Sequence, residues 1–333
     1  MRIKLKPLGE QVILITGASS GIGLVTAKAA AGRGARVVLV ARNEAALAEA
    51  VREIEATGGE AAYAVADVGD IDQVRAAAKV AVERFGRIDT WVNDAGVAIY
   101  AKLVDTPLDE HERMFRTNYF GVVHGCTVAL EHLGDAGGAL ITVGSIASDI
   151  PSPILGAYSA TKHATKAYVE SLRIELGGDK VPVSITLVKP AGIDTPIGQH
   201  AANHVPGEAL IPPPVYDPEL VAKAILNSAE RPRREITVGG AGRAQVLFGT
   251  HFPALFEKLA PMQAKAVVDT DRPKTRGNDL FASDEAGRER SGIVNPRRTS
   301  FYTEAQLHPA VAATIGVAVA AGIVGMIAAR RRD

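Results

Sequence analysis

The sequence predicts an α/β fold built on a doubly wound parallel sheet of about seven strands. Residues 11–240 alternate short β-branched runs with longer Ala-rich stretches, a pattern typical of parallel strands joined by crossover helices. The run Val12–Ile15 is apolar throughout, as expected of a central strand that is covered on both faces. A glycine-rich turn at 16–23 then leads from this run into a helical stretch.

Each predicted strand is rich in β-branched or small apolar residues and is followed by turn-forming residues. The strands are expected at Val12–Thr16, Arg36–Val40, Ala61–Ala66, Thr90–Asn93, Ala139–Gly144, Val183–Lys189 and Ile236–Val238. Helices are expected between them. Residues 44–57 are one example, because Leu47, Val51 and Ile54 recur near one helical face.

The balance of positive and negative residues excludes a strong electrostatic field of one sign around the whole protein. Lys plus Arg and Asp plus Glu each total 37, so we expect no nucleic-acid partner and look for binding at local sites. Cys126 is the single cysteine, which excludes an internal disulfide and agrees with a reducing compartment. The N-terminal residues enter a strand-like run at once, so we expect no signal peptide.

Two segments interrupt the alternation. Asp194–Pro218 contains three consecutive prolines at 212–214, so it cannot form one regular helix, and its position suggests a lid. Residues 263–304 mix charges of both signs with Gly and Pro and are expected to form a flexible linker. The predicted organisation is a catalytic domain over 8–262, this linker, and an apolar helix over 305–333.

The segment 309–329 contains no charged residue and precedes three arginines at 330–332. At about 1.5 Å per residue, a helix of this length spans a hydrocarbon core of about 30 Å. One interpretation is a membrane contact that anchors a catalytic domain lying in the cytoplasm. The other is a helix that packs on the core or on a second subunit, because the segment is rich in Ala and Gly. The arginines favour a cytoplasmic C-terminus, which leaves the orientation of an anchor open.

The glycine turn and the ends of the next three strands suggest a dinucleotide site. Glycines let the backbone approach a pyrophosphate at a helix N-terminus, although a purely structural turn is the alternative. Arg42 follows the second strand, where an NAD site offers an acid; its guanidinium suits the 2′-phosphate of NADP, unless it is simply solvated. Asp67-Val68 could bind adenine, and residues 93–96 could line the adenine and ribose side.

Three further residues suggest proton-transfer chemistry. Ser145 closes the fifth predicted strand, and Tyr158 and Lys162 follow it. Positions i and i+4 share a helical face, so the phenol and the ammonium point the same way. A nearby cation favours the phenolate, so the sequence predicts a Tyr158 pKa lowered toward working pH. The alternative is an ordinary surface Tyr and Lys pair.

At these residues the chain resembles the short-chain dehydrogenases/reductases, over residues 11–240. The matching motifs, in family order, are Thr16-Gly17-x3-Gly21-Ile22-Gly23, Asn93-x-Ala95-Gly96, Asn118, Ser145, Tyr158-x3-Lys162 and Pro190-Ala191-Gly192-Ile193-Asp194-Thr195. Two positions depart from the family pattern: Asp94 replaces the usual second Asn, and Ala191 intervenes in the usual Pro-Gly. Neither is one of the tetrad residues, so we expect altered loop hydrogen bonds and retained chemistry.

The resemblance implies a Rossmann-like sheet and a catalytic tetrad of Asn118, Ser145, Tyr158 and Lys162. Asn118 would hold a water that links Lys162 to solvent, and Lys162 would bind the nicotinamide ribose. The NADP(H) contacts expected from the motifs and the resemblance are Gly17, Ser19, Ser20, Gly21, Ile22, Gly23, Arg42, Asp67, Val68, Asn93, Ala95, Gly96, Tyr158, Lys162, Ile193 and Thr195.

The expected reaction interconverts a carbonyl and a secondary alcohol on a small apolar substrate, with NADP(H) as cofactor and without a metal. His200 and His204 are spaced like helical metal ligands but lie in the Pro-rich segment, so we do not assign them to a metal. A reductase of lipid-like 3-oxo chains is a second interpretation. A non-catalytic nucleotide-binding regulator or membrane scaffold is a third. We also expect a homo-oligomer.

Overall fold

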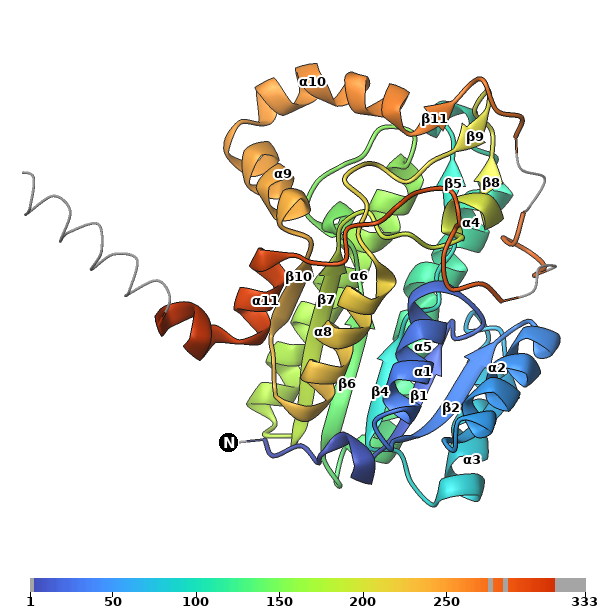
Figure 1. Ribbon diagram of the computed structural model, residues 1–333, viewed down its shortest axis with the longest axis vertical. Helices are drawn as coiled ribbons and strands as arrows, with labels where there is room; N and C mark the ends of the chain where they lie inside the picture. The colour runs from blue at the N-terminus through green and yellow to red at the C-terminus, as the bar shows by residue number, and fades with distance from the viewer. Residues whose placement is uncertain (1–2, 275–277, 284–286, 315–333) are drawn as a thin grey trace, which may run out of the picture.

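A computed structural model describes residues 3–274, 278–283 and 287–314 (Figure 1). Its strands are β1 Val12–Thr16, β2 Arg36–Ala41, β3 Glu60–Val65, β4 Thr90–Asn93, β5 Ile99–Tyr100, β6 Gly138–Val143, β7 Val183–Pro190, β8 Ala202–Asn203, β9 Glu208–Ala209, β10 Glu235–Val238 and β11 Val268–Asp269. Its longer helices are α1 Gly21–Ala31, α2 Glu44–Ala56, α3 Ile71–Phe85, α4 Leu108–Phe115, α5 Gly121–Leu133, α6 Gly156–Gly178, α8 Pro218–Glu230, α9 Gly240–His251 and α10 Pro253–Ala266. Shorter helical segments are η1 Leu8–Glu10, η2 Leu103–Asp105, η3 Arg116–Phe120, η4 Ile146–Ser148, α7 Ile197–His200 and α11 Phe301–Leu307.

The seven long strands form one parallel sheet in the order β10-β7-β6-β4-β1-β2-β3. The seven predicted strands are therefore confirmed, with ends that differ by at most one residue. The order of the strands changes direction at β1: β2 lies on one side of it, and the chain then crosses to β4 on the other side. A crevice forms at such a switch point, at the carboxyl ends of the strands.

Helices cover both faces of the sheet, as the sequence predicts (Figure 1). Side chains of α1, α2 and α8 pack with Ile13 and Ile15 of β1 in one core cluster. Side chains of α3, α5 and α6 pack with Val12 and Leu14 in the other. The alternation of β1 side chains between two buried layers explains why its sequence is apolar at successive positions.

The predicted lid, Asp194–Pro218, is an irregular connection that contains α7 and two very short strands. One of these, β8, pairs with β5, and the other, β9, pairs with β11. Pro218 begins α8, where the Asp217 side chain accepts a hydrogen bond from the Glu219 N–H. The prediction that this segment is not one helix is confirmed, and it covers the carboxyl edge of the sheet.

The predicted linker over 263–304 differs from what its described residues show. β11 pairs with β9, Leu280 and Ser291 are buried, and the Ser300 side chain caps α11. The sequence has no periodic pattern here because single side chains and backbone carbonyls make the contacts, rather than one face of a helix or strand. This part of the chain packs on the catalytic domain.

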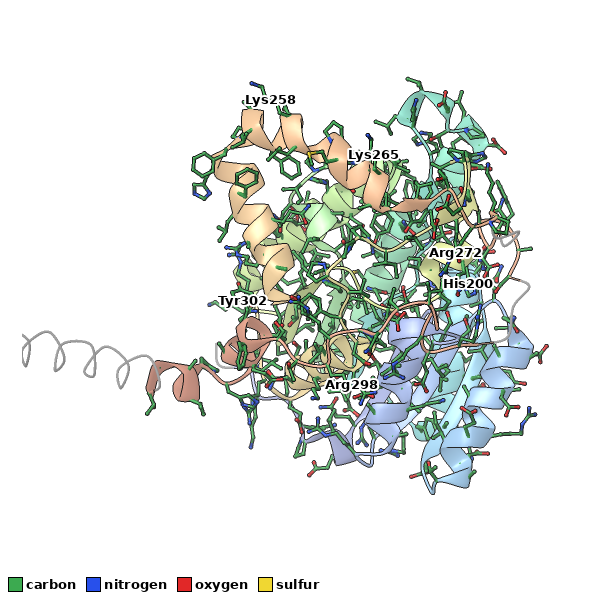
Figure 2. All side chains as sticks on the ribbon, turned by 45° about the horizontal axis from the view of Figure 1, so that its top comes forward. His200, Lys258, Lys265, Arg272, Arg298 and Tyr302 are labelled. Atoms are coloured by element: carbon green, nitrogen blue, oxygen red, sulfur yellow. The ribbon has the colours of Figure 1, made fainter. Side chains whose placement is uncertain are left out.

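The C-terminal part of the chain is described only to residue 314. Most of the predicted apolar segment, 309–329, therefore lies outside the described residues. Within the described ranges, no helix has the length and hydropathy required to cross a bilayer. Upstream, α10 lies at the outer edge of the molecule and carries Lys258 and Lys265 (Figure 2).

Close packing of α5 on β4 gives a first prediction. Gly125 has no room for a side chain, because a Cβ there would overlap the Asn93 Oδ1 that accepts a hydrogen bond of 2.8 Å from Trp91 Nε1. We expect Gly125→Ala to lower the free energy of unfolding by about 1–3 kcal/mol. Denaturant unfolding measures this change. Gly177→Ala is the control, since nothing lies within 4 Å of its Cβ; equal stability of the two variants would contradict the packing argument.

Candidate active site

The glycine turn after β1 is packed tightly against the end of β4. Gly17 has a φ of +74°, and a Cβ there would lie 2.7 Å from the backbone N of Ala95. The Thr16 hydroxyl accepts hydrogen bonds from the backbone N–H groups of Asp94 and Ala95, at 3.1 and 3.3 Å. The turn and the strand end are thus fixed as one unit, at the position where the strand order reverses.

A single large cavity extends from this turn to the first turns of α6. It is lined by Gly17, Ser19, Ser20, Gly21, Ile22, Arg42, Asp67, Val68, Asp94, Ala95, Gly96, Ser145, Tyr158, Lys162, Ile193 and Thr195, together with apolar residues of the loops above. Most of the predicted cofactor and catalytic residues therefore converge on one cavity. The glycine turn lines the cavity where α1 begins, so its backbone N–H groups and the helix N-terminus suit a pyrophosphate, and the residues fit a dinucleotide.

Three predicted residues do not line the cavity. Gly23 lies behind the turn, where a Cβ would overlap the Gly17 carbonyl oxygen. Asn93 points into the core, with its side chain bonded to Trp91 and 3.5 Å from Cys126 Sγ. These positions support the cavity wall, so their role in binding is indirect.

Asn118 is the third of these residues and lies fully buried in η3, a π-helical turn. Its side chain both accepts from the Val97 N–H at 2.8 Å and donates to the Val97 carbonyl at 2.9 Å. A Cβ on Gly96 would be 3.5 Å from Asn118 Oδ1 and 3.9 Å from Lys162 Nζ. Asn118 and Lys162 therefore flank the same glycine, as the tetrad requires. Irregular helical turns of this kind are frequent at functional sites.

Tyr158 and Lys162 lie on one face of α6, and both line the cavity with Ser145. The Tyr158 hydroxyl is hydrogen-bonded to Ser145. Lys162 Nζ donates to the Val143 carbonyl at 2.9 Å and lies 5.6 Å from the centre of the Tyr158 ring. The predicted juxtaposition of these three side chains is confirmed.

Burial controls the protonation of this group. Burial raises the pKa of Tyr158 to about 12, although the hydrogen bond with Ser145 opposes the rise. The predicted lowering of the Tyr158 pKa is wrong for this structure, because burial and, to a smaller extent, the Asp94 charge both raise it. Burial also lowers the pKa of Lys162 to about 8, and the nearby Asp94 charge opposes that change. The phenol is held neutral and is ready to donate a proton.

Asp94 stands out in the sequence only because it replaces the usual second Asn of the motif at 93–96, but the structure places it beside Lys162. Its carboxylate accepts a hydrogen bond from the Gly23 N–H and interacts with the Lys162 charge. Burial raises the pKa of Asp94 to about 7, and Lys162 opposes the rise. Asp94, at the position of the usual Asn, thus places a titratable group beside Lys162.

At the far end of the cavity, Arg42 and Arg113 meet. Arg113 donates to Asp67 Oδ2 at 2.6 Å and to the Leu280 carbonyl at 2.8 Å. Arg42 donates to the Leu280 carbonyl at 3.2 Å and to the carbonyls of two flanking residues. Arg113 and the residues near Leu280 were not found from the sequence, because no local motif marks them.

Comparison with known proteins agrees with this geometry. Residues 11–205 match the family model for short chain dehydrogenases. The oxidoreductase YxnA of Bacillus subtilis is 40% identical over 336 residues, which cover 99% of this chain and 93% of that protein. The dehydrogenase/reductase SDR family member 7B of Danio rerio is 29% identical and covers 79% of this chain.

Solved structures give the same result. An alcohol dehydrogenase of Thermococcus sibiricus, complexed with 5-hydroxy-NADP, superposes with a TM-score of 0.61 at 27% identity and covers 68% of this chain and 95% of that one. A short-chain dehydrogenase/reductase of Burkholderia phymatum, complexed with NAD, has a TM-score of 0.62 at 28% identity and covers 74% of this chain and 94% of that one. The chain therefore belongs to the short-chain dehydrogenase/reductase family of oxidoreductases.

Proposed function

We propose that this protein is an NADP(H)-dependent oxidoreductase that interconverts a carbonyl and a secondary alcohol on a small apolar substrate. The observation that carries the proposal is the group of Ser145, Tyr158 and Lys162, which line the same cavity as the glycine turn. A non-catalytic nucleotide-binding protein has no need for a proton donor that is hydrogen-bonded to a serine inside this cavity.

The residues of this group divide the work of proton transfer. In the reductive direction, Tyr158 donates its proton to a carbonyl oxygen that Ser145 positions by hydrogen bonding. The positive charge of Lys162 stabilises the phenolate that remains. When bound, the nicotinamide supplies the hydride in reduction and accepts it in oxidation. Asn118 lies beside Gly96 and Lys162, a suitable place from which to link the lysine to solvent.

The walls near Tyr158 favour an apolar substrate. The cavity is lined there by Ile150, Pro151 and Leu155 from the loop before α6, and by Ile211 and Pro212 from the connection that covers the sheet edge. A substrate bound against these side chains loses contact with water, which strengthens the hydrogen bond from Ser145.

The choice of NADP(H) rests on the end of β2. Ala41 stands where an NAD-binding site carries an acid, and the next residue, Arg42, lines the cavity. A guanidinium pairs well with a phosphate, whereas an acid would repel it. The two structural relatives named above were solved with 5-hydroxy-NADP and with NAD, so the preference of this chain must come from its own residues.

Loss of the Tyr158 hydroxyl tests the catalytic assignment. We expect Tyr158→Phe to lower turnover by about 100-fold or more while cofactor affinity stays nearly constant, because the change removes only the transferable proton. Oxidation of NADPH with a panel of ketones measures turnover, and fluorescence titration measures binding. Tyr63→Phe, whose hydroxyl contacts Glu44 on the surface, is the matched control. Activity of Tyr158→Phe within tenfold of wild type would contradict the assignment.

Removal of the Arg42 charge tests cofactor preference. We expect Arg42→Ala to lower the ratio of NADPH affinity to NADH affinity by about 10-fold to 100-fold, the contribution of a charge-assisted contact. The ratio of the two affinities is measured, and not the NADPH affinity alone, because Arg42 also holds backbone carbonyls. Loss of those contacts should change the affinity for both cofactors by the same factor. Arg52→Ala, on the exposed face of α2, should leave the ratio unchanged. Equal affinity of wild type for both cofactors would refute the preference.

Asp94 should influence the pH dependence of the reaction. Lys162 is cationic below its pKa of about 8. Burial lowers this pKa, and the negative charge of Asp94 opposes the lowering. We expect Asp94→Asn to lower the pKa of Lys162, so that the alkaline fall in kcat/KM for reduction begins at lower pH. The control is Asp72→Asn at an exposed position on α3. An alkaline limb that stays in place or moves to higher pH would contradict the coupling.

A further inference from the structure

The C-terminal part of the chain adds a wall to the cavity that the family motifs do not include. We define the strap as the described residues 278–283 and 287–293. It lies outside the matched range 11–205, and it runs across the carboxyl edge of the sheet toward α11 (Figure 1). Asp279 and Ser283 line the cavity together with Arg42 and Ser19. The strap therefore contacts the end of the cavity where the cofactor's adenosine is expected.

The first contact of the strap is with two cationic side chains. Arg42 donates hydrogen bonds to the carbonyls of Asp279, Leu280 and Phe281. Arg113 donates to the same Leu280 carbonyl. Two guanidinium groups, one directly after β2 and one on α4, thus hold three successive backbone carbonyls, and Leu280 is almost completely buried.

The second contact is with the glycine turn. The Gly21 N–H, at the N-terminus of α1, donates to the Arg288 carbonyl at 2.8 Å. Gly287 lies so close to the turn that a Cβ there would overlap the Ser19 carbonyl oxygen. The strap therefore rests directly on the backbone that is expected to face the pyrophosphate.

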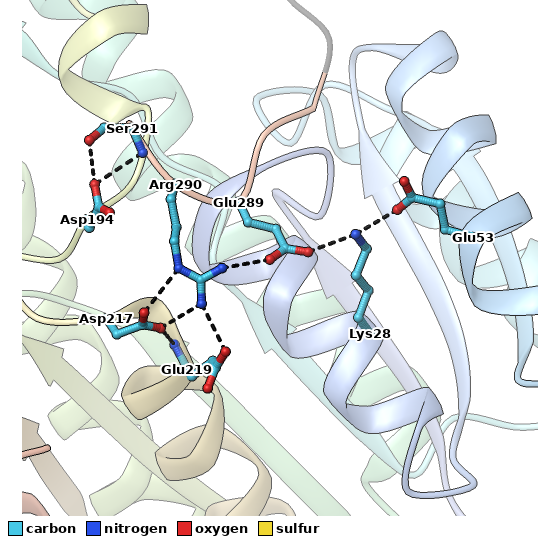
Figure 3. Close-up of polar contacts among 8 residues, drawn as sticks. All are labelled: Lys28, Glu53, Asp194, Asp217, Glu219, Glu289, Arg290 and Ser291. Atoms are coloured by element: carbon cyan, nitrogen blue, oxygen red, sulfur yellow. Dashed lines mark hydrogen bonds and ion pairs between the residues drawn. The ribbon is translucent and has the colours of Figure 1, made fainter. Parts of the chain in front are cut away.

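The third contact is an ion-pair cluster around Arg290 (Figure 3). Arg290 Nε and Nη2 lie 3.0 and 2.9 Å from the two carboxylate oxygens of Asp217, a bidentate pair. The same guanidinium donates to Glu219 at 2.9 Å and to Glu289 at 3.0 Å. Glu289 in turn accepts from Lys28 of α1 at 2.7 Å. The Asp217 side chain is only 4% exposed, so this pair is stronger than an ordinary surface salt bridge.

The fourth contact ties the strap to the loop after β7. The Ser291 N–H donates to Asp194 Oδ1 at 3.1 Å, and the Ser291 hydroxyl donates to the same oxygen. Asp194 is buried and lies between Ile193 and Thr195, which both line the cavity. The strap thus holds two of the segments that are expected to touch the cofactor, the glycine turn and this loop.

We propose that the strap is a component of the dinucleotide site: it closes the adenosine end of the cavity over the cofactor, and the Arg290 cluster sets how fast the cofactor is exchanged. A cofactor bound in the cavity, which the glycine turn and the strap both line at this end, can leave only when the strap separates from the turn. That separation must break the Arg290 and Ser291 contacts. The proposal rests on dinucleotide binding by the family fold and is independent of the choice between NADP(H) and NAD(H).

Cofactor release from the full chain tests this role. Stopped-flow fluorescence measures the dissociation rates of NADPH and NADH from wild type and from Arg290→Met, which removes the charge and keeps much of the side-chain volume. We expect both rates to rise by about tenfold or more, because the contacts of Arg290 are charge-assisted. The factor should be the same for both cofactors, because these contacts are with Asp217, Glu219 and Glu289 and not with Arg42. Arg290→Lys, which keeps the charge and loses the bidentate geometry, should fall between the two.

The matched control is Arg272→Met. Arg272 precedes the strap (Figure 2) and pairs with Glu208 of β9 and Asp269 of β11, so its ion pairs are not with residues of α1 or α8. Its release rates should stay within twofold of wild type. Thermal unfolding confirms that each variant is folded, and Arg290→Lys serves as the test variant if Arg290→Met does not fold.

The outcomes separate this proposal from the proposed function. If wild type binds cofactor and the Arg290 variants release it at the wild-type rate, the strap has no role in exchange, while the oxidoreductase function stands. If Arg272→Met accelerates release as much as Arg290→Met, the effect is general destabilisation and the proposal is wrong. If wild type binds neither NADPH nor NADH, both the proposed function and the strap's role are refuted.

Discussion

The joint between the glycine turn and the end of β4 is the constraint on which the site depends. Gly17 adopts a left-handed backbone conformation and packs against Ala95 with no space for a side chain, while the Thr16 hydroxyl holds two N–H groups of the same segment. This contact fixes the switch point of the sheet. The helix α1 then begins at the cavity, and the residues after β4 reach the first turns of α6, so the cofactor and proton-transfer ends share one cavity.

Burial decides the electrostatics of the proton-transfer end. Lys162 is buried and Tyr158 and Asp94 are partly buried, and in each case the loss of water favours the neutral form over the charged form. The result is a neutral phenol beside a lysine and an acid that titrate near neutral pH. A reductive step needs a proton on the tyrosine, and this arrangement keeps one there.

The C-terminal segment adds a wall to the cavity beyond the residues that match the family model. The solved relatives described above superpose on 68% and 74% of this chain, whereas YxnA aligns with 99% of it. The strap uses backbone carbonyls for Arg42 and Gly21 and side chains for Asp194 and Asp217. Ordering a long segment loses conformational entropy, which is unfavourable. The ion pairs of the Arg290 cluster are partly shielded from water, and their favourable free energy offsets part of this loss.

The sequence by itself determined the strands, the order of the motifs and the placement of Ser145, Tyr158 and Lys162 near one another. These features are local: a run of β-branched residues, a glycine spacing or an i,i+4 pair carries its own geometry. They also indicated the dinucleotide site and its connection to a known family.

Only the tertiary structure decided the direction of the Tyr158 pKa, the charge beside Lys162 and the contacts of the described residues after 263. The pKa depends on burial, which no short spacing encodes, and Asp94 becomes important only because the fold places it opposite α6. Arg42 and Leu280 are 238 residues apart in the chain, and the strap binds through carbonyls that every residue type possesses. Contacts of that kind leave no pattern in the sequence, since their specificity comes from position and not from side-chain identity.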